Sequence, residues 1–175
     1  MLHHSVPPIA NSYWVLPGRL LAGGYPGPLD AGETNRKITQ LLGAGVTFFL
    51  NLTEENRLAP YAAALNVEAR AMGRCVRHRR LAIRDFDVPP PEDMVRILDA
   101  IDEALDDGHV VYVHCWGGIG RTGTVMGCYL VRHGMGGQKA LQEIAGMRKG
   151  TPYAERAAPE TEAQRRMVLG WVEGQ

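Results

Sequence analysis

The stretch that decides the fold reads VVYVHCWGGIGRTG and occupies residues 110–123. Its first four residues, 110–113, are apolar and mostly β-branched, a pattern typical of a strand that is buried on both faces. The glycines that follow interrupt regular structure, and a helix is expected from Arg121 to His133, ended by Gly134. The intervening loop should therefore lie at the carboxyl end of a buried strand, where open α/β sheets bind ligands.

This loop combines a thiol, an anion cradle and a guanidinium. Glycines let successive backbone N–H groups converge on an anion, and the N-terminus of the following helix adds its partial positive charge. Arg121 presents a planar fork that binds two phosphate oxygens at once. The same donors favour the thiolate of Cys115, which is its nucleophilic form. The predicted phosphate-binding residues are Trp116, Gly117, Gly118, Ile119, Gly120 and Arg121.

Outward from the loop, strands alternate with helices. An apolar run at 46–52 predicts a second buried strand, a hairpin is expected over 13–22, and a further strand over 78–83. Helices are expected at about 30–43, 58–71, 91–107, 121–133, 138–149 and 159–173. This order predicts an α/β fold with a central mixed, mostly parallel sheet covered by helices on both faces. No repeat or linker divides residues 1–175, so we expect one catalytic domain.

Composition limits the classes of partner. The 19 Lys and Arg residues balance the 19 Asp and Glu residues, so no overall field attracts nucleic acid or an anionic membrane. Apolar runs are strand-sized and the N-terminus lacks the pattern of a secretion signal. The odd set of three cysteines favours a reducing compartment, and we expect a cytoplasmic protein. No feature indicates the oligomeric state, and a monomer is the default.

The Cys-x5-Arg loop, preceded by His114 and followed by Thr122, resembles the signature of the cysteine-dependent protein tyrosine phosphatase superfamily. The short chain is similar to the compact dual-specificity-like branch, and the loop 116–120 resembles those of cyclin-dependent-kinase-inhibitor-associated phosphatases and their bacterial relatives. The resemblance implies a protein tyrosine phosphatase-like fold and hydrolysis of phosphotyrosine through a phosphocysteine on Cys115. Phosphoserine and phosphothreonine stay open as further substrates. No cofactor is implied.

Cleavage of a phosphoester also needs a proton for the leaving oxygen. The stretch IRDFDVP at residues 83–89 resembles the general-acid loop of the dual-specificity branch. Asp85 is the preferred acid and Asp87 the alternative. An Asp pair beside prolines is also ordinary turn chemistry, so the assignment rests on the resemblance.

Three further residues receive supporting roles from the resemblance. Thr122 would stabilise the departing thiolate, and His114 would order the loop around the cysteine. Gln164, in a Thr-x-x-Gln element at 161–164, would orient the water that hydrolyses the intermediate. Each has a plain structural interpretation: a helix-start hydrogen bond, a satisfied core histidine and a solvated glutamine.

Competing interpretations remain at this point. A phosphoinositide or inositol phosphate is the alternative substrate, favoured by a basic cluster at 74–80 but opposed by the absence of lysine from the loop. A sulfurtransferase or arsenate reductase would use a similar cradle but not Asp85. A non-catalytic phosphate-binding module is the third alternative. Cys75 and His78 have a zinc-like spacing without a second pair, so no metal site is predicted, and Cys128 is expected to be a core residue.

Overall fold

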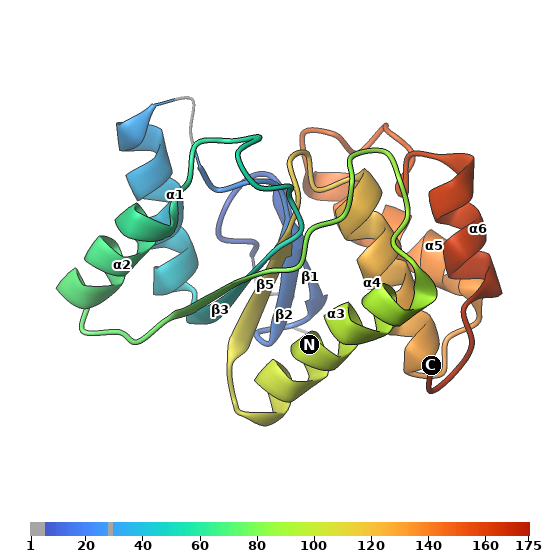
Figure 1. Cartoon of the computed structure of the whole chain (residues 1–175). Helices are drawn as coiled ribbons and strands as arrows, with labels where there is room; N and C mark the ends of the chain where they lie inside the picture. Colours follow the sequence, from blue (N-terminus) through green and yellow to red (C-terminus); the bar gives the residue numbers. More distant parts are fainter. Residues whose placement is uncertain (1–5, 28–29) are drawn as a thin grey trace.

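The computed structural model describes residues 6–27 and 30–175, which form a five-stranded sheet flanked by helices (Figure 1). The strand order is β1-β2-β5-β3-β4. The strands are β1 (Ser12–Leu16), β2 (Leu20–Gly23), β3 (Val46–Asn51), β4 (Arg77–Arg80) and β5 (Val110–His114). Only β1 and β2 pair antiparallel, while β2 with β5, β5 with β3, and β3 with β4 pair parallel. The predicted α/β fold with a mixed, mostly parallel sheet is confirmed.

The two buried runs of the sequence occupy the interior of the sheet. Their side chains alternate between two apolar cores, because successive residues of a strand point to opposite faces. Val111 and Val113 of β5 pack in one core with α3 (Pro91–Asp106), α4 (Gly120–Arg132), α5 (Gly137–Met147) and α6 (Glu162–Gly170). Tyr112 of β5 and Phe49 of β3 pack in the other core with α1 and α2. Figure 1 shows α1 and α2 on one side of the sheet and α3 and α4 on the other.

The helices are close to the predicted ranges. They are α1 (Ala31–Gly43), α2 (Ala62–Ala71), α3 (Pro91–Asp106), α4 (Gly120–Arg132), α5 (Gly137–Met147) and α6 (Glu162–Gly170), with a 3-10 turn η1 at Arg148–Gly150. The starts of α1 and α3 have clear local causes. Asp30 accepts a hydrogen bond from the Glu33 N–H at the start of α1, and Pro91 opens α3.

Several boundaries differ from the prediction by three residues or more, and one of them is the end of α6, at Gly170 rather than at 173. Helix α2 begins at Ala62 rather than near residue 58, because the residue before Pro60 is biased away from helical geometry. Helix α6 begins at Glu162, because Thr161 and Gln164 form a capping box there. Strand β4 ends at Arg80, although the Ile83 N–H still donates to the Leu52 carbonyl at 3.0 Å.

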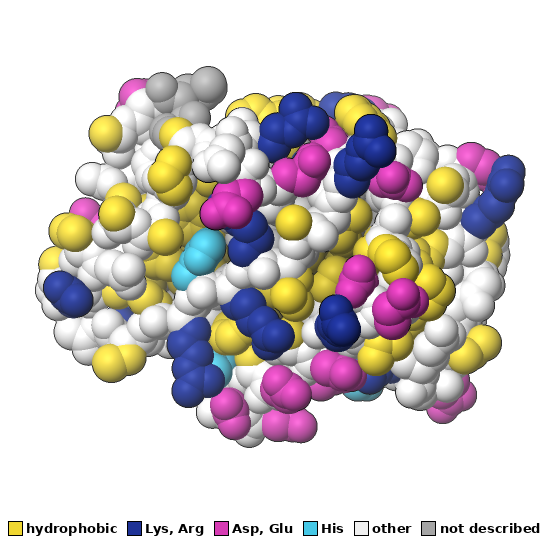
Figure 2. All heavy atoms as spheres, viewed as in Figure 1, with side chains coloured by type: hydrophobic (Ala, Val, Ile, Leu, Met, Phe, Trp, Pro, Cys, Tyr) yellow, Lys and Arg dark blue, Asp and Glu magenta, His cyan; other side chains and the backbone are white. Residues whose placement is uncertain are grey.

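The surface carries charges of both signs. On the face shown in Figure 2, Lys and Arg side chains lie among Asp and Glu side chains rather than in one large patch. Residues 77–80 of the basic cluster form β4, whose side chains are mostly exposed and which pairs with β3 at the edge of the sheet, and Arg74 lies before this strand. Arg77 of this strand forms an exposed ion pair with Asp107 at 3.4 Å. None of the helices in the described ranges is long and apolar enough to cross a membrane.

Candidate active site

The loop between β5 and α4 is held by close backbone contact with the end of β2. Gly118 has a φ of +69°, a conformation that side chains with a Cβ rarely adopt. A Cβ on Gly118 would also lie 2.5 Å from the carbonyl carbon of Gly23. No other residue type fits there, so this glycine sets the curvature of the loop.

The carbonyl groups of the loop are bound from the β1–β2 side. The Tyr25 N–H donates to the Trp116 carbonyl at 2.9 Å, and the Asn11 side-chain amide donates to the Gly117 carbonyl at 3.0 Å. Within the described residues, the N–H groups from 116 to 119 donate to no protein acceptor. Unpaired loop N–H groups beside the N-terminus of a helix form an anion-binding cradle.

The predicted nucleophile lies at the wall of a cavity of about 320 Å³. Cys115 is 3% exposed. The cavity is also lined by Asp85, by Arg121 and by residues of the loop that joins Cys115 to Arg121. A neighbouring cavity of about 230 Å³ shares Asp85, Trp116 and Arg121 with it. The structure thus brings the thiol and the guanidinium of the loop together with a carboxylate from a separate part of the sequence, Asp85.

Arg121 connects the two halves of this site. Its side chain is 5% exposed, and one terminal nitrogen lies 3.0 Å from Oδ1 of Asp85. The other donates to the Ile83 carbonyl at 3.2 Å. Because both contacts go to the predicted acid loop at residues 83–89, the guanidinium holds this loop beside the cavity.

The two candidate acids differ in their surroundings. Asp85 lines both cavities, whereas Asp87 lines neither. Each carboxylate accepts a hydrogen bond from the next residue, Asp85 from the Phe86 N–H at 3.2 Å and Asp87 from the Val88 N–H at 2.8 Å. Phe86, between them, has a φ of 60°, which is uncommon for a bulky side chain. The turn at Phe86 points the carboxylates of Asp85 and Asp87 in different directions. The carboxylate of Asp85 is the one that lies beside Arg121.

His114 is fully buried behind the cysteine. Burial lowers its pKa to about 3, so the imidazole is neutral. Its Nδ1 lies 3.2 Å from the Cys115 carbonyl, which can only accept, and its Nε2 lies 2.6 Å from the Tyr61 hydroxyl. The contacts assign the proton to Nδ1 and make Tyr61 the donor to Nε2. These hydrogen bonds fix the orientation of the His114 imidazole, and its role in ordering the loop stays a prediction.

Because the His114 imidazole is buried and neutral, the free energy of unfolding should depend on pH. The pKa of histidine is about 6.5 in the unfolded chain, so between pH 6.5 and 3 the unfolded state binds more protons. Stability then falls as the pH falls through this window, by about 2 kcal/mol between pH 7 and 5 from this one group. Urea denaturation at both pH values should show that His114→Asn removes this part of the slope. His109→Asn is the control. If the free energy of unfolding changed equally with pH in His114→Asn and His109→Asn, His114 would not be the source of the pH dependence.

Thr122 and Gln164 are both buried but bonded to other groups. The Thr122 hydroxyl donates to the Gly23 carbonyl at 3.4 Å. The Gln164 amide oxygen accepts the N–H groups of Glu160 and Thr161, and its nitrogen donates to the Asp87 carbonyl at 3.2 Å. Gln164 thus caps α6 and ties it to the acid loop. The roles in thiolate stabilisation and water orientation stay predictions.

The remaining predicted residues fall in separate places. Trp116 is 51% exposed and lines both cavities, so it forms part of the rim rather than packing beneath the loop. Cys128 is buried in α4, and burial raises the pKa of its thiol to about 12. Cys75 is exposed, and all three cysteines are free. Among residues 6–27 and 30–175, no cluster of three His, Cys, Asp or Glu side chains could hold a metal ion.

Sequence reasoning missed several residues that build the site. Tyr61 is 53 positions from His114, and Asn11 is 106 positions from Gly117. No local sequence pattern could have indicated contacts over such separations. Glu160 and Arg156 line the cavity that contains Cys115, and they form an ion pair with each other. Glu160 directly precedes the Thr-x-x-Gln element, which was the one available signal.

Comparisons with known proteins show the family of the chain. The family model described as "Swiss Army Knife protein, DSP-PTPase phosphatase domain" (PTP-SAK) matches residues 9–169. The chain is 31% identical over 115 residues to the phosphatidylglycerophosphate phosphatase PTPMT1 of Arabidopsis thaliana, covering 65% of this chain and 30% of that protein. It therefore spans less than a third of this curated relative.

Solved structures share the fold. A kinase associated phosphatase structure aligns with a TM-score of 0.68 and 18% identity, covering 85% of this chain and 83% of that one. Pseudomonas aeruginosa TpbA in complex with pTyr aligns with a TM-score of 0.69 and 20% identity, covering 95% and 87%. Since the family match extends over nearly the whole chain, this protein belongs to the PTP-SAK family of dual-specificity-type cysteine phosphatase domains.

Proposed function

We propose that the protein hydrolyses phosphotyrosine in proteins through a phosphocysteine on Cys115, with Asp85 as the general acid. The observation that carries this proposal is that Cys115, Asp85 and Arg121 line one cavity whose loop N–H groups are unpaired. The Asp85–Arg121 contact of 3.0 Å supports a docked acid loop.

In the first step, the phosphate of the substrate would bind the loop N–H groups and Arg121. The Cys115 thiolate attacks phosphorus, an S–P bond forms, and the bond from phosphorus to the ester oxygen breaks. Asp85 donates its proton to that oxygen as it leaves. Because the bound phosphate replaces the Asp85 carboxylate as the partner of Arg121, its charge favours the protonated acid. The fixed donors stabilise the charge that develops on the phosphoryl oxygens.

In the second step, water would attack the phosphocysteine and Asp85 would accept its proton. The S–P bond breaks and the thiolate and phosphate are released. Glu160 lies on the same cavity, with its carboxylate 2.7 Å from the position that a Cβ on Gly120 would take. Glu160 lines the cavity that contains Cys115, whereas Gln164 does not, and Glu160 therefore joins Gln164 as a candidate to orient this water.

Exposed aromatic side chains favour an aromatic phosphate ester. Phe86 is 61% exposed and Trp116 is 51% exposed, and both line the catalytic cavity. Rings at the mouth of a phosphate site contact the phenyl ring of phosphotyrosine, which phosphoserine lacks. Phosphotyrosine is therefore the preferred substrate, and phosphoserine and phosphothreonine are secondary ones.

The charges around the cavity favour one phosphate group over several. Arg156 is paired with Glu160, and Arg57, in the adjoining cavity, lies 3.6 Å from Glu54. Little positive charge remains for the extra phosphates of a phosphoinositide. The lipid alternative is kept because the Arabidopsis relative is named a phosphatidylglycerophosphate phosphatase.

Phosphate release from a matched set of substrates tests the proposal. A phosphotyrosine peptide, the corresponding phosphothreonine peptide and phosphoinositide vesicles are incubated without metal, with Cys115→Ser as the blank. We expect kcat/KM to be at least about tenfold higher for the phosphotyrosine peptide, a discrimination of about 1.4 kcal/mol. If the phosphoinositide vesicles were hydrolysed in preference to both peptides, the substrate would be a lipid rather than a protein. If Cys115→Ser also released phosphate, the mechanism through the Cys115 thiol would be rejected.

A further inference from the structure

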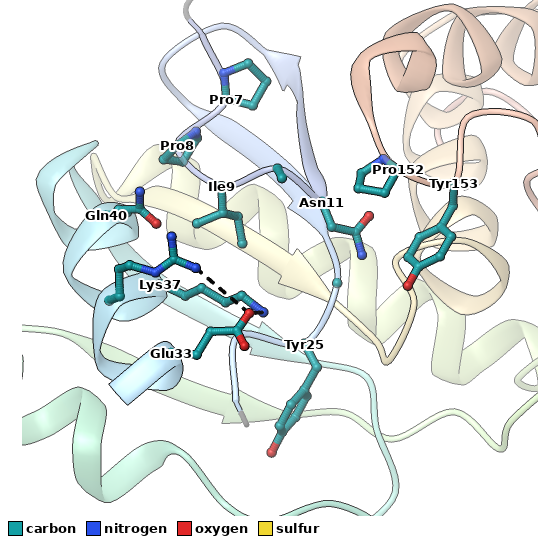
Figure 3. Close-up of a pocket in the computed structure, with 13 residues that line it drawn as sticks. Pro7, Pro8, Ile9, Asn11, Tyr25, Glu33, Lys37, Gln40, Pro152 and Tyr153 are labelled. Carbon is teal, nitrogen blue, oxygen red and sulfur yellow. Dashed lines mark ion pairs between the residues drawn. The ribbon is translucent and has the colours of Figure 1, made fainter. Parts of the chain in front are cut away.

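A second hollow lies beside the active site, between the N-terminal segment, α1 and the segment after η1. Its volume is about 450 Å³. Figure 3 shows Glu33 and Lys37 of α1 on one side, Pro152 and Tyr153 on the other, and Asn11 between them. We call this hollow the α1 groove. The catalytic steps described above use none of its charged residues.

The α1 groove and the cavity that contains Cys115 adjoin the same smaller cavity. A connecting cavity of about 160 Å³ shares Asn11, Tyr25, Lys37 and Tyr153 with the groove. At its other end it shares Trp116 and Gly117 with the cavity that contains Cys115. A substrate whose phosphate lies on the cradle can therefore extend past Trp116 into the groove.

The walls of this path are fixed by hydrogen bonds. Buried Arg148 donates to the carbonyls of Tyr153 and Arg156, both at 2.8 Å, and so holds the segment that lines the groove and the catalytic cavity. The Tyr25 hydroxyl donates to the Ala59 carbonyl at 2.8 Å. A path that exists before binding imposes a small ordering cost on its ligand.

Among the described lining residues, positive charge exceeds negative charge along this path, whereas the two balance in the cavity that contains Cys115. The catalytic cavity pairs two arginines with two carboxylates, whereas Lys37 is the single charged residue among the described residues that line the connecting cavity. In the groove, Lys37 lies 2.9 Å and Arg36 lies 4.0 Å from the same oxygen of Glu33. Two cations share one carboxylate, so the groove has room for one further anionic group.

We propose that the α1 groove binds an acidic side chain of a phosphorylated polypeptide, a few residues from its phosphotyrosine, through Lys37 and Arg36. This inference rests on the proposed function. One unbalanced positive charge matches a single carboxylate rather than a polyphosphorylated headgroup. Prolines, tyrosines and the amides of Asn11 and Gln40 provide the apolar and polar contacts that an extended peptide uses.

A peptide scan tests this proposal. Phosphotyrosine peptides carry one Glu, or Gln as its neutral equivalent, at each position from about four residues before to about four after the phosphotyrosine. For at least one position we expect kcat/KM to be about fivefold higher with Glu, the size of a partly exposed ion pair. The ratio of kcat/KM for the Glu peptide to that for the Gln peptide should fall to about one in Lys37→Met and below one in Lys37→Glu. In the wild type this ratio should decrease at high salt.

Lys139→Met is the matched control, because Lys139 is exposed on α5 and lines none of these cavities. It should keep the full preference for Glu. A Glu preference that survives in Lys37→Met, or the absence of any preference in the wild type, would overturn the groove proposal while leaving peptide hydrolysis intact. Failure of the wild type to hydrolyse any peptide would instead reject the proposed function, and the groove proposal with it.

Discussion

Cys115→Ser is expected to abolish hydrolysis, with kcat lowered by at least about 10⁴-fold. A serine hydroxyl is far less acidic than a thiol, and the donors around the loop cannot make it an alkoxide near neutral pH. The anion cradle should survive, because it is built from backbone groups and Arg121. The variant should therefore still bind inorganic phosphate or a phosphotyrosine peptide, as isothermal calorimetry would show.

The covalent intermediate provides the direct measurement. Rapid acid quenching with ³²P-labelled substrate should trap label on the wild-type protein and none on Cys115→Ser. Cys75→Ser is the control, because Cys75 is exposed and distant in sequence from the loop, and it should keep full activity. Label on Cys115→Ser, or equal loss of activity in Cys75→Ser, would show that another residue is the nucleophile.

Asp85→Asn is expected to lower kcat by about 10²- to 10³-fold for phosphotyrosine, because the leaving phenolate then departs without a proton. The loss should be much smaller for aryl phosphates with strongly acidic leaving groups, which need no protonation. A plot of log kcat against leaving-group pKa should thus be steeper for the variant than for the wild type.

Asp87→Asn is a closely matched control, two residues away and with the same change in charge. Its carboxylate accepts the Val88 N–H and lines neither cavity next to Cys115, so we expect at most a severalfold effect. If Asp87→Asn, rather than Asp85→Asn, acquired the steep leaving-group dependence, Asp87 would be the acid. The Asp85–Arg121 ion pair would then serve only to hold the loop.

Local sequence alone determined the elements and the centre of the site. The apolar runs in β3 and β5 predicted buried strands because only a sheet covered on both faces keeps such runs from water. The glycines, Cys115 and Arg121 are contiguous in the chain, so their chemistry could be predicted without a fold. Asp30 and Pro91 marked helix starts through local hydrogen bonding and backbone geometry.

Tertiary structure decided what surrounds that centre. The contact of Gly118 with Gly23, the Tyr61–His114 hydrogen bond and the place of Glu160 on the catalytic cavity each join distant parts of the chain. The choice between Asp85 and Asp87 depends on the turn at Phe86, and the α1 groove depends on how α1 packs beside the segment after η1. Side-chain chemistry is written in the sequence, but which groups meet is determined by the packing of elements that no local pattern specifies.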